Sequence, residues 1–176
     1  IARLGMQNMA DIAMAATMGP KLFNADGYES LIKSIWETSL ATAVWAREIA
    51  RQGRRNVEST FLCGLLFQIG RPVILQTALD IARTNDSVVD EDLLNDLMDA
   101  YQSQVGQVLS EHWQLPVAVS HTIAGVSADG VAEGSHDIVD TVKAAMVFAE
   151  STINGRSYNA DELIASSAVI ALNLYA

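Results

Sequence analysis

The stretch Phe61-Leu62-Cys63-Gly64-Leu65-Leu66-Phe67-Gln68-Ile69-Gly70 indicates how this chain folds. Its side chains are apolar on nearly every side of a helix, and such a helix is normally buried among other helices. Asn56 is a candidate N-cap and Gly70 a candidate stop, so the pattern predicts a helix over residues 57–69. Gly64 inside this helix costs about 1 kcal/mol relative to alanine. Close approach of a neighbouring helix is the usual reason for such a glycine, so we expect this helix to be central.

Helical spacing of apolar residues continues along the rest of the chain, and no strand-like alternation is found. Many alanines with only three prolines favour closely packed helices over sheets. The sequence therefore predicts an all-α fold, a compact bundle of about seven to eight helices, in a single domain over residues 1–176. The expected helices cover residues 2–18, 28–52 (with Gly53 as its C′ residue), 57–69, 72–83, 92–113 with a break near 99–102, 116–126, 137–153 and 161–174.

The charge balance argues against nucleic-acid binding. The net charge is −10, with 21 acidic and 11 basic residues, whereas binding to phosphates needs clustered lysines and arginines. Arg51, Arg54 and Arg55 do cluster, but at a predicted helix end, where cations complement the helix dipole. Charged residues make up only 18% of the chain. That low share suits either a domain that buries surface against partners or an ordinary alanine-rich bundle.

Targeting signals and disulfides are not expected. No apolar stretch reaches the roughly 20 residues of a membrane span, and no signal peptide precedes the first helix. We therefore expect a cytoplasmic location without membrane attachment. Cys63 is the one cysteine, so no internal disulfide can form, and its apolar surroundings predict an inert core thiol.

Residue patterns that carry chemistry are missing from the sequence. His112, His121 and His136 do not stand at the spacing that places two imidazoles on one helical face. No nucleophile elbow or phosphate-binding glycine loop occurs. The acidic run at residues 90–92 is typical of a solvated face or a helix N-terminus. We expect no metal, no cofactor and no catalytic residue.

The central stretch nevertheless resembles a known enzyme signature. With His in place of Phe67 and Asp in place of Gln68, it would read GLLHDIG, which is similar to the His-Asp signature of the HD phosphohydrolases and of the related HDOD domains (HD-related output domains). Residues 35–43 resemble the family's W-x-H-S-x-x-x-A segment, and residues 105–116 its V-G-x-x-L…W-x-L-P run. Residues 2–5 resemble a Leu-Gly turn from the middle of an HDOD domain. The likeness covers residues 1–150 and implies an HD-like bundle.

The same resemblance implies a metal site that has lost its ligands. Phe67 cannot bind a metal, and Gln68 offers only a neutral carbonyl oxygen in place of a carboxylate. The former site positions are Thr38, Phe67, Gln68, Gln102, Val126 and Glu150. They are interpreted either as a repacked core or as a neutral pocket for a small ligand.

For function, the resemblance implies a non-catalytic signalling domain that binds protein partners, which include a fused or separate signalling domain. A small-ligand sensor, for example for a nucleotide, and a residual metal-dependent phosphohydrolase are the alternatives. The family normally has further helices before the Leu-Gly turn, so we expect this chain to lack them. Their absence would expose the methionine-rich residues 6–18, which predicts a homodimer or a partner that covers this face.

Overall fold

The computed structural model describes residues 27–127, 136–154, 169, 170 and 172. Each element named in this part is an α-helix, which confirms the all-α prediction. The expected count of seven to eight is not confirmed, because the helices expected at 2–18 and 161–174 lie largely outside the described residues. The described helices are α2 (Glu29–Gln52), α3 (Val57–Leu66), α4 (Gly70–Thr84), α5 (Glu91–His112), α6 (Val117–Val126) and α7 (His136–Asn154).

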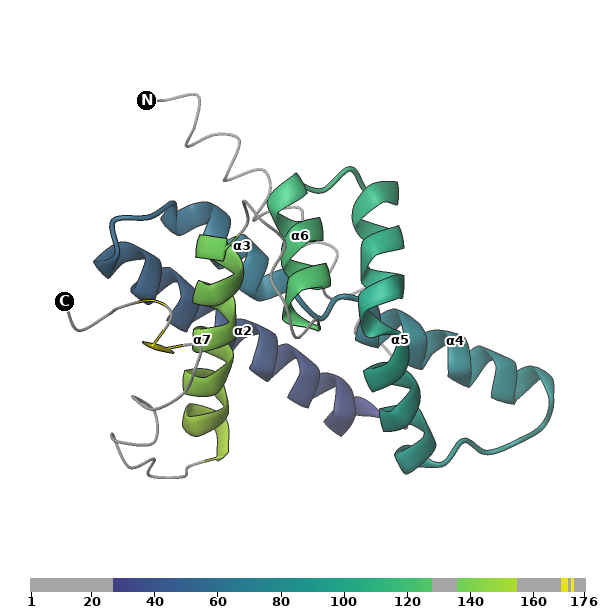
Figure 1. Cartoon of the computed structure of the whole chain (residues 1–176). Helices are drawn as coiled ribbons and strands as arrows, with labels where there is room; N and C mark the ends of the chain where they lie inside the picture. The colour runs from purple at the N-terminus through teal and green to yellow at the C-terminus, as the bar shows by residue number, and fades with distance from the viewer. Residues whose placement is uncertain (1–26, 128–135, 155–168, 171, 173–176) are drawn as a thin grey trace.

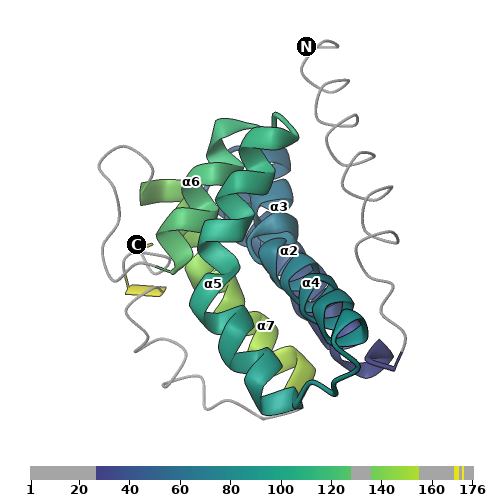
Figure 2. The same cartoon turned by 90° about the vertical axis from the view of Figure 1, so that its right-hand side faces the viewer.

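The long helix α2 organises the bundle. It packs mainly against α3 and α7, while α4 packs against α5, and α6 contacts α3, α5 and α7. In Figure 1 the α4–α5 pair extends to one end of the molecule, with the connection at residues 85–90 at its tip. Figure 2 views the molecule from the side of this pair. The α4–α5 pair is therefore a hairpin set against the rest of the bundle.

Two apolar clusters hold these helices together. The larger one joins α2, α3, α6 and α7 and includes Leu65, Leu66 and Phe67, with Trp36 half-buried against it. The smaller one joins α2 to the α4–α5 hairpin. It consists of Ile32, Ile35, Leu75, Leu79, Leu94 and Met98. The hairpin thus has a separate core of its own.

Gly64 allows α3 to lie very close to α2. A Cβ atom at Gly64 would be 2.9 Å from the Cα of Ala43 and 3.2 Å from the Cβ of Ala46. The first of these neighbours is backbone and cannot rotate away. The expected close approach of a neighbouring helix is confirmed, and small residues on both helices make it possible.

The end of α2 differs from the expectation. Gly53 was expected as the left-handed C′ residue, but its φ is −76° and the left-handed residue is Arg54, with φ of 53°. The Arg55 N–H donates to the Ala50 carbonyl at 2.8 Å, which closes the turn. The same closure follows α4 at Asp86 and α5 at Gln114, which also have positive φ.

Two further boundaries were predicted wrongly. Gly70 is not a helix stop but the first residue of α4. It must be glycine because a Cβ there would collide with the carbonyl oxygen of Gln102. The break expected near residues 99–102 is absent, since α5 is continuous from Glu91 to His112. Asp99 and Gln102, at the two ends of the expected break, are held by Arg71 of α4.

The apolar stretch that contains α3 and α4 is longer than expected. By length and composition, Val57–Thr84 could cross a membrane, contrary to the sequence-based expectation. In the structure, 67% of its most apolar window is buried inside the bundle. A core helix passes the same test, and residues 67–69 form a turn that divides the stretch into two helices.

Replacing Gly64 by alanine tests the close contact between α2 and α3. Helix propensity alone would favour alanine by about 1 kcal/mol, but the new methyl group meets the backbone of Ala43. We expect Gly64→Ala to lower the free energy of unfolding in urea by about 1–3 kcal/mol. Gly53→Ala is the control, because its Cβ would meet the Ile49 carbonyl oxygen at an ordinary 3.4 Å and Arg55 Nε at 3.3 Å, where the flexible Arg55 side chain can move aside. Equal stability of the two variants would contradict this account of Gly64.

Candidate functional site

Four of the six predicted site positions line one cavity. A cavity of about 340 Å³ between α2, the α3–α4 turn and α5 is bordered by Thr38, Phe67, Gln68 and Gln102. Thr38 comes from α2, Phe67 and Gln68 from the turn after α3, and Gln102 from α5. The remaining lining residues are Leu31, Ser34, Ile35, Arg71, Asn95 and Met146. The fold therefore brings together residues that lie far apart in the sequence.

Gln68 is fixed by its amide group. Its side chain is only 6% exposed, and Nε2 donates to the Ile35 carbonyl at 2.9 Å and to Ser39 Oγ at 3.0 Å. A carboxylate at this position could not donate to a carbonyl oxygen. The amide thus satisfies buried acceptors on α2 and ties the α3–α4 turn to that helix. Phe67 beside it is equally buried and belongs to the larger apolar cluster.

Arg71 brings a positive charge to the cavity wall. Its Nε donates to Gln102 Oε1 at 3.1 Å, and its Nη2 donates to Asp99. Sequence reasoning missed this residue. The available signal was the spacing of Asp99 and Gln102, which lie three apart and so share a face of α5. This part of the cavity wall is therefore polar, and the charge of Arg71 is balanced by that of Asp99.

Two predicted positions do not line the cavity. Val126 at the end of α6 is partly buried and packs against the larger apolar cluster. Glu150 of α7 is exposed. Met146, one turn earlier on the same helix, lines the cavity instead. The acidic residue that the family resemblance suggested at Glu150 therefore does not take part in this cavity.

The cavity residues do not fit a metal ion of the HD type. Thr38 offers a hydroxyl group, Phe67 offers no ligand atom, and the Gln68 amide nitrogen already faces Ile35 and Ser39. Within the described residues, no group of three or more His, Cys, Asp or Glu side chains could hold a metal. The carboxylate of Asp99 is paired with Arg71.

Cys63 lies one turn before Phe67 and is fully buried. Burial raises the pKa of its thiol to about 11, although nearby Thr122 and Ser59 oppose the shift by hydrogen bonding. A neutral buried thiol is a poor nucleophile. The structure thus agrees with the prediction of a core thiol.

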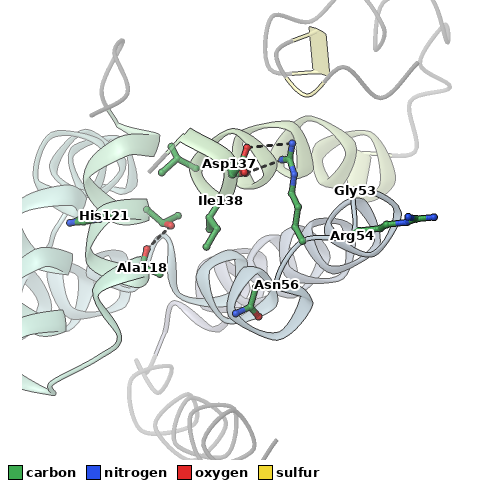
Figure 3. A pocket seen from close by; sticks show the side chains of 10 residues that line it. Gly53, Arg54, Asn56, Ala118, His121, Asp137 and Ile138 are labelled. Atoms are coloured by element: carbon green, nitrogen blue, oxygen red, sulfur yellow. Dashed lines mark hydrogen bonds and ion pairs between the residues drawn. The ribbon is translucent and has the colours of Figure 1, made fainter. Parts of the chain in front are cut away.

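A second, larger cavity lies at the other end of α3. It measures about 640 Å³ and is bordered by the α2–α3 connection, α6 and the start of α7 (Figure 3). Arg55 spans it, since Nη1 donates to the Asp137 carbonyl at 3.1 Å and to Thr141 Oγ1 at 2.8 Å. Figure 3 shows that Arg54 and His121 point away from the space between the helices. Arg55 thus links the α2–α3 connection to α7. The expectation that the arginine cluster at the end of α2 complements the helix dipole therefore applies less well to Arg55.

Comparisons with known proteins agree with this fold. A family model described as HDOD domain matches residues 1–128, so the chain belongs to the HDOD domain family. A solved structure from Shewanella amazonensis SB2B, named "Putative metal-dependent phosphohydrolase", superposes with a TM-score of 0.65 at 17% identity. The superposition covers 97% of this chain and 68% of that one. At this identity the likeness shows the fold alone. A comparison with curated proteins gave no match.

A pair of Gln→Glu substitutions tests the account of the site. Gln68→Glu removes the donor to Ile35 and leaves two buried acceptors facing each other. We expect the free energy of unfolding at neutral pH to fall by about 2–4 kcal/mol. Burial should raise the pKa of the new carboxyl above its ordinary value of about 4.3. The protonated carboxyl group can donate a hydrogen bond to the Ile35 carbonyl. The variant should therefore regain stability as the pH falls below this raised pKa and lose it as the pH rises.

Gln102→Glu is the matched control, because it places a carboxylate next to Arg71 Nε. Its effect should stay below about 1 kcal/mol, as for other partly exposed ion pairs. Urea unfolding of both variants at neutral and acidic pH provides the measurement. Equal destabilisation of the two would show that Gln68 does not act as a buried donor.

Cys63 should be unreactive in the folded chain. Its pKa of about 11 leaves almost no thiolate at neutral pH, and burial blocks access. Because the pKa of the thiol is higher in the folded chain, protonation of Cys63 favours the folded state. This contribution to the free energy of unfolding is complete below the ordinary pKa of 9.0 and is lost as the pH rises towards 11. Modification with a disulfide reagent at about pH 8 should therefore wait for unfolding in denaturant. Rapid labelling of the native chain would contradict this burial.

Proposed function

We propose that this HDOD domain is a non-catalytic signalling domain that acts by binding other proteins. The observation that carries the proposal is the arrangement of Gln68. Where the related signature has an aspartate, this chain has an amide whose nitrogen is committed to Ile35 and Ser39 on α2. Thr38 and Phe67 add no metal-binding group of HD type. The former site supports the bundle rather than a reaction.

The family context fits this role. HDOD domains resemble HD hydrolases but are associated with bacterial signalling, as the sequence resemblance implies. Their partners are proteins, which include fused or separate signalling domains, and a cytoplasmic location is consistent with that role. The Shewanella protein is named for a phosphohydrolase, but this chain lacks the His-Asp pair at residues 67 and 68.

A small-ligand sensor is the second candidate. The cavity of about 340 Å³ remains open between α2, α4 and α5, and its lining combines apolar side chains with polar groups that could hydrogen-bond a small ligand. Arg71 and Asn95 would supply the polar contacts. A thermal-shift screen with nucleotides tests this function. A stabilising nucleotide whose effect disappears in Arg71→Met but persists in Arg83→Met would favour the sensor over the protein-binding domain.

Metal analysis and an activity assay test the main proposal. We expect purified protein to carry no stoichiometric metal and to hydrolyse no generic phosphodiester substrate when Mg²⁺, Mn²⁺ or Zn²⁺ is added. Activity that a chelator abolishes and a divalent ion restores would contradict the proposal. Thr38→Ala separates intrinsic activity from contamination, because an enzyme at this site would change its rate whereas a contaminant would not.

A further inference from the structure

The outer surface of the α4–α5 hairpin carries an apolar groove. It has a volume of about 300 Å³, and its walls include Val73, Ile74 and Ile81 from α4, and Leu97, Tyr101 and Val105 from α5. Ile81 is 57% exposed and Tyr101 is 49% exposed. Thr77, which also borders the groove, donates its hydroxyl to the Val73 carbonyl within α4. The groove therefore presents mainly apolar surface.

Packing of the hairpin onto the bundle does not account for the most exposed of these residues. The side chains that fix the hairpin to α2 are Leu75 and Leu79 on α4, and Leu94 and Met98 on α5. Ile81 and Tyr101 belong to neither buried cluster. Exposed apolar surface of this kind, when it is continuous, usually marks an interaction site.

The shape of the groove suits a helix. Leu97, Tyr101 and Val105 are spaced four apart on α5, so they form a stripe about 12 Å long. Ile74, Ala78 and Ile81 follow the corresponding helical spacing on α4. A groove between two helices accepts the apolar face of a third helix, which inserts residues at the same spacing.

The charge around the groove selects the partner. Residues 80–99 contain seven acidic residues and one basic residue, and one of the seven, Asp99, is paired with Arg71 outside the groove. Asp86, Asp92 and Asp96 are exposed near the tip of the hairpin. Arg83 is the one basic residue in this range, and its Nη1 lies 3.7 Å from Asp80 Oδ1. The helix dipole accounts for acidic residues in the first turn of α5, but not for Asp86 or Asp96.

We propose that the α4–α5 groove binds an amphipathic helix of a partner protein that has an apolar face and flanking lysines or arginines. The inference rests on the proposed protein-binding function and names its surface. A second copy of the chain fits less well, because it would bring the same acidic residues to the contact. Residues 1–26 also fit less well, since they contain two basic and two acidic residues.

Binding of a synthetic peptide tests the groove in the full chain. The probe is a labelled peptide of about 18 residues, or five helical turns, with leucines on one face and lysines elsewhere. Its control has the same composition, with the leucines distributed around the helix. Fluorescence anisotropy at about 0.15 M salt limits long-range charge attraction. We expect the amphipathic peptide to bind at least about tenfold more tightly than the control, a difference of about 1.4 kcal/mol.

Two variants with the same added charge locate the binding surface. Ile81→Asp lies in the groove, whereas Val117→Asp lies on α6, where Val117 is 68% exposed. Ile81→Asp should raise the Kd at least about tenfold, although its added charge favours a basic peptide. Val117→Asp should leave the Kd nearly unchanged. If Ile81→Asp does not fold, Tyr101→Ser takes its place.

Several results would overturn the inference. Equal binding of both peptides would indicate attraction by charge alone. A dimer in light scattering that Ile81→Asp dissociates would make a second copy the occupant. A large loss of thermal stability in Ile81→Asp, without peptide binding to the unmodified chain, would mean that the chain fills its own groove. If the chain binds no amphipathic peptide and also shows no hydrolase activity, the groove proposal is refuted while the proposed non-catalytic function stands. Metal-dependent hydrolase activity would instead refute the proposed function.

Discussion

The close contact between α2 and α3 is the constraint on which the rest of the structure depends. Gly64 lies so near Ala43 that no larger side chain fits between the two helices. This approach brings the turn after α3 onto α2, where the Gln68 amide reaches the Ile35 carbonyl and Ser39. The turn then starts α4 at Gly70, whose missing side chain allows α5 to pass directly over it. Each contact therefore fixes the starting geometry of the next.

The first of these contacts could be predicted from the sequence. The apolar run with Gly64 at its centre predicted a buried helix and a close neighbour, and both are found. The C-terminal ends of α2, α4 and α5 were predicted to within one residue. The residues that close the following turns were not, because Arg54, Asp86 and Gln114 adopt left-handed backbone conformations that glycine would favour. Backbone hydrogen bonds close these turns whatever the side chain, so composition gives little sign of them. A break was expected near residues 99–102, but α5 is continuous there. Asp99 and Gln102 are held by Arg71, which lies 28 residues from Asp99 in the sequence.

The resemblance supplied six positions for the candidate site, and four of them, Thr38, Phe67, Gln68 and Gln102, border one cavity. Val126 packs against the larger apolar cluster instead. Glu150 was chosen only as an available acidic residue near the expected position, and it is exposed. The polar groups beside the cavity are paired within the protein. The Gln68 amide donates to Ile35 and Ser39, and Arg71 pairs with Asp99 and Gln102.

The division of the core into two clusters has a consequence for the dynamics of the molecule. The hairpin of α4 and α5 is fastened to α2 mainly through six buried residues, while the larger cluster joins four helices. Backbone amides in the hairpin should therefore exchange with solvent through partial opening, at a lower free energy than those of α2 and α3. This difference would be greatest near the tip of the hairpin, because Leu109 and Trp113 at the other end of α5 pack against the larger cluster. The proposed partner surface lies on the hairpin, so its occupation would be thermodynamically linked to ordering of these two helices.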